Sequence, residues 1–92
     1  MIRLTGHLLC ASAEELAIVQ AHVGEHIRLT QQEPGCLSFE VVQTEDPMVW
    51  EVRETFKTRA DFDAHQIRTR ASEWFAQSKD IPRAFRVEEI AD

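Results

Sequence analysis

The stretch Glu54-Thr-Phe-Lys-Thr-Arg-Ala-Asp-Phe-Asp-Ala-His65 lies where a predicted strand runs into a predicted helix. Residues 48–56 alternate apolar and polar side chains, which is the period of a strand with one buried face. The buried face would contain Met48, Trp50, Val52, Glu54 and Phe56. One strand therefore brings a carboxylate onto an otherwise apolar face.

The second half of this stretch predicts the start of a helix. Thr58 and Asp61 have the spacing of a capping box, in which the first side chain accepts a hydrogen bond from the backbone three residues later. A helix that begins there carries His65 about two turns in. His65 and Glu54 thus meet at one strand-to-helix connection and are the candidate catalytic residues.

Upstream, the sequence predicts a strand followed by a long helix. Alternation over residues 2–10 indicates the strand. A second capping box at Ser12–Glu15 precedes apolar side chains at helical spacing, which predict a helix over residues 13–32. Pro34-Gly35 ends that helix, because proline cannot continue its hydrogen bonds and glycine accepts a positive φ.

A second strand is expected directly after this turn. Residues 37–42 alternate, and their apolar face contains Leu37, Phe39 and Val41. The turn residues Glu45-Asp-Pro47 separate this strand from the one that leads to Glu54. The two strands should therefore form a hairpin.

Beyond His65 the helical pattern changes phase. Phe62 lies off the backward extension of the apolar stripe that follows it. That stripe contains Ile67, Ala71, Trp74, Phe75 and Ser78. We therefore expect a kink or short break near residues 66–70, and a last strand over residues 84–90.

The predicted order, β-α-β-β-α-β, is that of a ferredoxin-like α+β fold in a single domain over residues 1–92. A right-handed crossover and the hairpin together give an antiparallel sheet of order 4-1-3-2. Cys10 then ends the first strand and Cys36 begins the second, about 25 Å apart at roughly 3.3 Å per residue. A disulfide needs Cα atoms within about 7 Å, so both cysteines should be reduced.

The composition argues against several classes of partner. Ten basic and sixteen acidic residues give a net charge of −6 without any basic cluster, so nucleic acid and anionic membranes are not expected partners. No signal peptide and no apolar run of about 18 residues is present, which favours the cytoplasm. A 92-residue chain has a thin core, and pairing with a second copy is a natural way to bury more surface.

No motif predicts a metal or nucleotide site. The chain lacks Cys-x-x-Cys and a glycine-rich phosphate loop. His22 and His26 have the i, i+4 spacing of metal ligands, but no third ligand accompanies them. We expect them to be a solvated or core-edge pair.

Three segments resemble the antibiotic biosynthesis monooxygenase family, including its quinol monooxygenase members. They are Glu33-Pro-Gly-Cys-Leu-Ser-Phe-Glu-Val41, Val52-Arg-Glu-Thr-Phe56 and Ala60-Asp-Phe-Asp-Ala-His65. The resemblance implies a homodimeric α/β barrel in which two sheets pack face to face, with a pocket between the sheet and helices of each subunit. It also implies oxidation of phenolic or polycyclic aromatic substrates by O2 with no metal, flavin or haem cofactor.

Carried onto this sequence, the family's helix histidine falls on His65 and its strand glutamate on Glu54. The family often continues past this histidine with serine-proline-histidine, whereas this chain has Arg68-Thr-Arg70. The chain has no tyrosine, which excludes a tyrosine-dependent mechanism. It also has no asparagine, which argues against the activity of related haem-degrading enzymes.

The roles of these residues stay open at the level of sequence. His65 is either a general base or a structural histidine that bonds Glu54 or a backbone carbonyl. Glu54 is expected to orient His65 or to fix the strand-to-helix junction, rather than to act as the base. Five aromatic side chains either bind an aromatic substrate or form plain core. They are Phe39, Trp50, Phe62, Trp74 and Phe75.

Three functions are compatible with this sequence. The leading hypothesis is a cofactor-independent monooxygenase that acts on a quinol or another small phenolic molecule. The alternatives are a small-metabolite isomerase on the same scaffold and a non-catalytic ligand-binding or stress-response dimer. One fold hosts several functions, so the fold alone does not choose among them.

Overall fold

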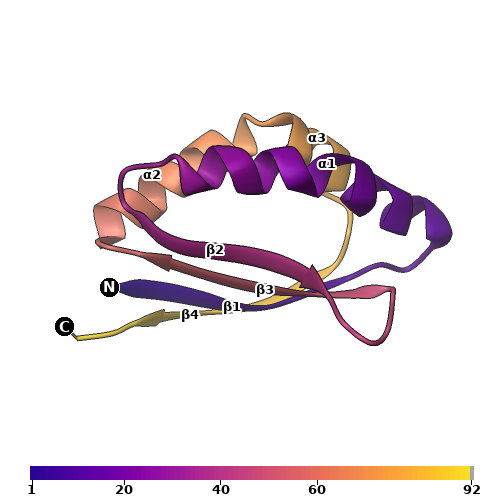
Figure 1. The fold of residues 1–92 in the computed structure, drawn as a ribbon, viewed down its shortest axis with the longest axis horizontal. Coiled ribbons are helices and arrows are strands. Elements are labelled where there is room, and N and C mark those ends of the chain that lie inside the picture. The colour runs from indigo at the N-terminus through magenta and orange to yellow at the C-terminus, as the bar shows by residue number, and fades with distance from the viewer. Residues whose placement is uncertain (92) are drawn as a thin grey trace.

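One sheet of four antiparallel strands carries all of the helices on one face (Figure 1). The structure is a computed structural model that describes residues 1–91. Its elements are β1 (Ile2–Leu9), α1 (Ala13–Gln31), β2 (Cys36–Gln43), β3 (Val49–Phe56), α2 (Arg59–Arg70), α3 (Glu73–Ser78) and β4 (Arg83–Glu89). The strand order β2-β3-β1-β4 confirms the predicted order 4-1-3-2 and the ferredoxin-like α+β fold.

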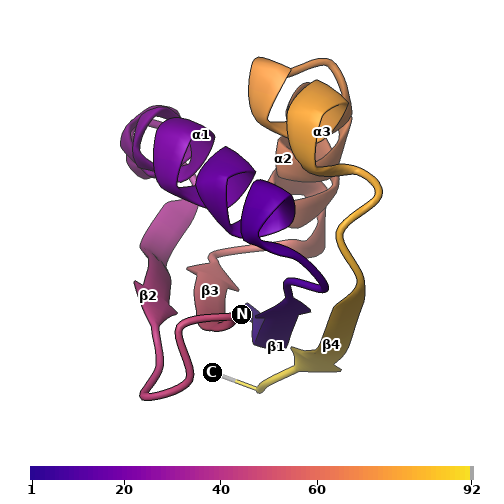
Figure 2. The same cartoon turned by 90° about the vertical axis from the view of Figure 1, so that its right-hand side faces the viewer.

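The helices divide the covered face of the sheet between them. Figure 2 shows α1 on the β2 side of the molecule and α2 with α3 on the β4 side. The helix-facing side chains of β3 are buried, as the alternation predicted: Trp50, Val52, Glu54 and Phe56. The core therefore lies between the sheet and the helices, and Glu54 is inside it.

The start of β2 differs from the prediction. Phe39 and Val41 are buried, but Leu37 is 56% exposed. The pairing of β2 with β3 shifts register between Cys36 and Ser38, which is a β-bulge. The extra residue turns the Leu37 side chain away from the face that simple alternation assigns to it.

The predicted break in the second helical region is real but lies a little later. The α2 helix ends at Arg70, and the Ser72 side chain caps α3 by accepting a hydrogen bond from the Phe75 backbone N–H at 3.2 Å. Because the two helices are separate, Ile67 does not continue the α3 stripe and is 67% exposed. The buried residues are instead Phe62 and His65 of α2, and Trp74 and Ser78 of α3.

Two further expectations concern the cysteines and membranes. Cys10 and Cys36 are both free thiols, as the topology predicted. In the part of the chain that the structure describes, no helix is both long and apolar enough to cross a membrane.

Candidate active site

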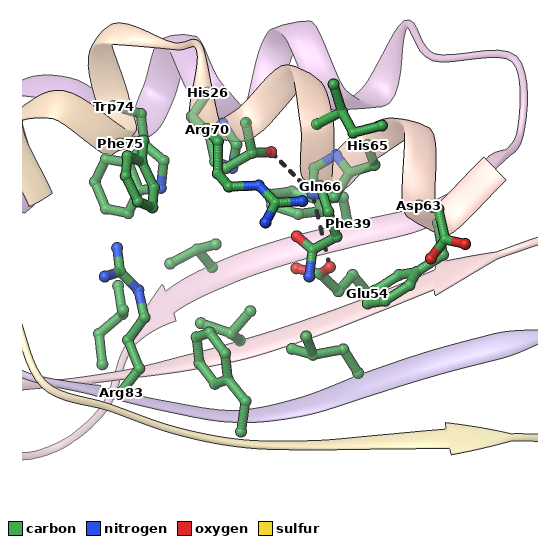
Figure 3. A pocket seen from close by; sticks show the side chains of 18 residues that line it. His26, Phe39, Glu54, Asp63, His65, Gln66, Arg70, Trp74, Phe75 and Arg83 are labelled. Carbon is green, nitrogen blue, oxygen red and sulfur yellow. Dashed lines mark hydrogen bonds and ion pairs between the residues drawn. The ribbon is translucent and has the colours of Figure 1, made fainter. Parts of the chain in front are cut away.

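A cavity of about 530 Å³ opens between the helices and the sheet (Figure 3). Its size is that of sites for drug-sized ligands, and its lining combines an apolar floor with a few polar groups. The lining residues are Leu4, Leu8, His26, Phe39, Val41, Val52, Glu54, Phe62, Asp63, His65, Gln66, Ile67, Thr69, Arg70, Trp74, Phe75, Arg83 and Phe85. The two predicted catalytic residues, His65 and Glu54, thus share one cavity.

His65 is 2% exposed and has a carboxylate behind its ring. Its Nδ1 lies 2.8 Å from Oε1 of Glu33, and the same oxygen accepts a hydrogen bond of 2.9 Å from Nε of Arg68. An ionised carboxylate only accepts hydrogen bonds, so in neutral His65 the proton is on Nδ1 and Nε2 carries the lone pair. Nε2 lies 3.4 Å from the Thr69 hydroxyl oxygen and 3.7 Å from Oε1 of Glu54.

The backbone around Gly35 brings Glu33 and His65 together, although they are 32 residues apart. Lys57 donates its backbone N–H to the Gly35 carbonyl at 2.9 Å. A Cβ atom on Gly35 would lie 2.1 Å from Cγ of Asp61, so no side chain fits there. Glycine therefore allows the turn between α1 and β2 to pack closely against the start of α2.

The start of α2 is fixed as the sequence predicted. Thr58 accepts a hydrogen bond from the Asp61 backbone N–H at 3.1 Å, and its hydroxyl donates to the Asp61 carboxylate at 2.9 Å. This cap sets the first turn of the helix and hence the direction in which His65 points. The predicted strand-to-helix junction is therefore the device that positions the histidine.

Glu54 is buried beside the imidazole. Burial, with a smaller contribution from the negative charge of Glu33, raises the pKa of Glu54 to about 8. At neutral pH the Glu54 carboxyl is therefore mostly protonated and can donate a hydrogen bond. The expected orienting bond to His65 is made by Glu33 and not by Glu54, because 3.7 Å is too long for a hydrogen bond.

The His65 imidazole is neutral in the resting site. Burial lowers the pKa of His65, while the hydrogen bond and charge of Glu33 partly oppose this effect. In this neutral imidazole the Nε2 lone pair accepts only the long, 3.4 Å hydrogen bond from the Thr69 hydroxyl, so it can take a proton from a molecule in the cavity that displaces this contact. The site therefore contains a base and a neutral acid side by side.

His26 is a cavity residue that the sequence analysis did not identify. It is 5% exposed, stacks on Trp74 with ring centroids 5.5 Å apart, and has a buried Nδ1 without a hydrogen-bond partner within residues 1–91. The expectation of a solvated or core-edge pair fits half-buried His22 but is wrong for His26. The spacing of the buried residues Val19, Val23, His26 and Thr30 on α1 is the signal that could have found it.

Four of the five predicted aromatic residues line the cavity. Phe39, Phe62, Trp74 and Phe75 surround it. Trp50 is buried in the core outside the cavity lining, and its Nε1 has no hydrogen-bond partner within residues 1–91. Trp50 is therefore no longer a candidate to contact a ligand in the cavity.

Across residues 1–91, no group of three or more histidine, cysteine, aspartate or glutamate side chains is arranged to hold a metal ion.

Comparisons with known proteins agree with this fold. A family model described as antibiotic biosynthesis monooxygenase matches residues 1–77. A candidate antibiotic biosynthesis monooxygenase from Nitrosomonas europaea is 22% identical with a TM-score of 0.78, and the alignment covers 97% of each chain. A Mycobacterium tuberculosis protein is 20% identical with a TM-score of 0.79, covering 99% of this chain and 95% of that one. No curated protein matches the sequence significantly.

Proposed function

Because the chain belongs to the antibiotic biosynthesis monooxygenase family, we propose that it oxidises a quinol or another phenolic or polycyclic aromatic molecule with O2 and no cofactor. One observation carries this proposal: the Nε2 lone pair of His65 faces an aromatic-lined cavity directly beside protonated Glu54. Such chemistry needs a base for a phenol, a donor for the oxyanion and an apolar cavity.

His65 acts as the base in this proposal. A phenolic hydroxyl at Nε2 loses its proton to the imidazole, which becomes an imidazolium with Nδ1–H still donating to Glu33. The negative charge of Glu33 stabilises the imidazolium at the moment it forms. Arg68 pairs with the same Glu33 oxygen, Oε1, and holds the carboxylate in place.

Glu54 acts as a hydrogen-bond donor. Its proton is retained because burial disfavours the carboxylate, so the side chain can donate to a phenolate oxygen or to reduced oxygen. A second negative charge here would repel the phenolate. The electron-rich anion then passes an electron to O2.

The overall reaction balances without an external reductant. For a methylene group activated by a neighbouring phenolic ring, CH2 and O2 give C=O and H2O. The substrate supplies all four electrons, one oxygen atom stays in the product, and the other leaves as water. A simple hydroquinone would instead lose two electrons and two protons, giving a quinone and hydrogen peroxide.

Oxygen uptake tests the proposal. Chelator-treated protein is mixed with a panel of naphthohydroquinones and phenolic compounds that contain an activated methylene, and the spontaneous rate in buffer is subtracted. We expect turnover with at least one compound, and 18O2 labelling would place one atom in a monooxygenated product. Rates equal to buffer for the whole panel would contradict the proposal and favour an isomerase or a ligand-binding protein.

We also propose that the chain forms a homodimer through the uncovered face of the sheet. Leu9 and Val42 are 40% and 49% exposed on that face, and burial of such side chains would stabilise a dimer. Sedimentation at micromolar concentration should give twice the chain mass of 10.6 kDa. A persistent monomer would contradict this part of the proposal.

A further inference from the structure

Most arginines that the structure describes pair with a carboxylate or lie over an aromatic ring, and two do neither. Within residues 1–91, five arginines form ion pairs with carboxylates: Arg3, Arg28, Arg53, Arg68 and Arg86. A sixth, Arg59, lies over the Phe62 ring. The remaining two, Arg70 and Arg83, both line the cavity. Acidic side chains outnumber basic ones in this chain, so a lack of carboxylates does not explain the unpaired arginines.

Arg83 is held by neutral oxygen atoms. Its Nη1 donates to the Ser78 and Ile81 carbonyls at 3.2 and 3.4 Å, and its Nη2 donates to the Ser78 hydroxyl at 2.8 Å. A guanidinium has more N–H donors than these bonds use, so donors on Nε and Nη2 stay available. A carboxylate can accept from two guanidinium nitrogens at once.

The surroundings of Arg83 favour an anion. The side chain is half-buried, and desolvation without a counter-charge lowers the pKa of its guanidinium. The guanidinium nevertheless keeps its charge at neutral pH. A bound anion would restore the electrostatic stabilisation that burial removes.

Arg83 lies at the far end of the cavity from the candidate base. Across β1, Leu8 pairs with Arg83 and Leu4 pairs with Glu54. The two positions are thus separated by about 13 Å along the strand and about 10 Å across it. Figure 3 shows Arg83 at one end, Glu54 and His65 at the other, and the Arg70 guanidinium between them. A ligand that contacts both ends of the cavity must therefore be elongated.

Flat aromatic side chains line the cavity between its two ends. Trp74 and neutral His26 stack on one another, and Phe39 and Phe75 complete the wall. Burial, more than the nearby positive charges, lowers the pKa of His26 to about 3, so its ring adds no charge. The lining therefore suits a fused aromatic ring system.

We propose that the cavity binds a fused-ring aromatic acid whose carboxylate pairs with Arg83 and whose phenolic hydroxyl faces His65 and Glu54. Arg70 adds a second positive charge on the path of the ligand. The orientation rests on the proposed function, because the reacting hydroxyl at His65 directs the opposite end of the molecule toward Arg83.

Calorimetric titration with two matched compounds tests this inference. The probes are 6-hydroxy-2-naphthoate and 6-hydroxy-2-naphthamide, which share ring and shape but differ in charge. We expect the acid to bind roughly 10- to 100-fold more tightly than the amide, because charge-assisted bonds to arginine are strong. Equal affinity, or no binding of either compound, would overturn the inference.

Variants then assign the preference to Arg83. Arg83→Gln should remove most of the preference for the acid, and Arg83→Lys should retain part of it. Arg86→Gln is the control, since Arg86 lies on the same strand but pairs with Glu88 outside the cavity. A preference that survives in Arg83→Gln would overturn the assignment, whatever the effect of Arg70→Gln. If Arg83→Gln does not fold, Arg83→Lys takes its place, and a preference as large as that of the wild type in Arg83→Lys would overturn the assignment.

The outcome is separable from that of the proposed function. Binding of the naphthoate requires no turnover, since it has one hydroxyl and is not a hydroquinone. A clear preference for the acid, together with no oxygen uptake by any phenol, would refute the monooxygenase and leave the anion site intact. Oxygen uptake without a preference for the acid would refute only the anion site.

Discussion

His65 on the α2 wall of the cavity and His26 on the α1 wall are both buried, with ring centroids 5.8 Å apart. His65 has the Glu33 carboxylate behind it, whereas His26 has aromatic rings around it and an unbonded Nδ1 within residues 1–91. Both pKa values are lowered by burial, but only at His65 does a negative charge oppose the effect. Burial is common to both histidines. The hydrogen-bonded carboxylate of Glu33 is therefore what allows His65, and not His26, to accept a proton.

Substitutions of His65 and His26 should differ most strongly in their effect on turnover. His65→Ala should lower turnover of an identified substrate by roughly 10² to 10⁴, the usual contribution of a general base. His26→Gln should change turnover per folded molecule by less than about tenfold, because His26 has no group to stabilise its charged form. Initial rates normalised to folded protein measure both. Comparable rate losses in the two variants would contradict the proposed difference between His65 and His26.

Acid should destabilise the fold through His26. The folded state disfavours its protonation, so its contribution to stability is present above the unfolded pKa of 6.5 and is lost as the pH falls toward about 3. At pH 4.5 the loss from this group should be on the order of 3 kcal/mol. Urea unfolding at pH 7.5 and 4.5 should show a correspondingly smaller loss for His26→Gln.

The matched control for this measurement is His22→Gln. His22 lies one turn earlier on α1 and is only half-buried, so this variant should keep the wild-type loss of stability in acid. If His26→Gln and wild type lose the same free energy of unfolding, His26 is protonated in the folded state. That result would contradict the proposed electrostatic difference between His65 and His26.

The partner of His65 should matter less than the ring itself. Glu33→Gln keeps the shape but removes the charge that stabilises an imidazolium, so we expect a rate loss of roughly 10- to 100-fold. Glu25→Gln is the control, because Glu25 also pairs with an arginine but lies on the exposed side of α1. An unchanged rate in Glu33→Gln would show that His65 needs no carboxylate.

The sequence predicted those parts of the site that depend on local patterns. Alternation placed Glu54 on the buried face of β3, and the cap at Thr58 placed His65 on α2. Glu33 escaped prediction because its contact with His65 spans 32 residues and depends on how closely two turns pack at Gly35. Leu37 was misplaced because a bulge leaves no clear mark in an alternating pattern.

The surroundings of two further residues, His26 and Arg83, could not be predicted from sequence patterns. His26 lies at a helical spacing shared by apolar residues, but a histidine there reads equally well as the edge of the core. Arg83 begins β4, and only the three-dimensional structure reveals that no carboxylate neutralises it within residues 1–91. Local periodicity therefore predicts the positions of residues better than it predicts their partners.

The pH dependence of kcat/KM, corrected for spontaneous oxidation, tests the central claim most directly. A neutral His65 base and a protonated Glu54 donor predict a bell-shaped profile. Its acidic limb should lie below pH 6.5, and its alkaline limb near pH 8, where Glu54 ionises. In Glu54→Gln the alkaline limb should disappear while the acidic limb stays. A flat wild-type profile between pH 5 and 9, or an alkaline limb that persists in Glu54→Gln, would contradict the account.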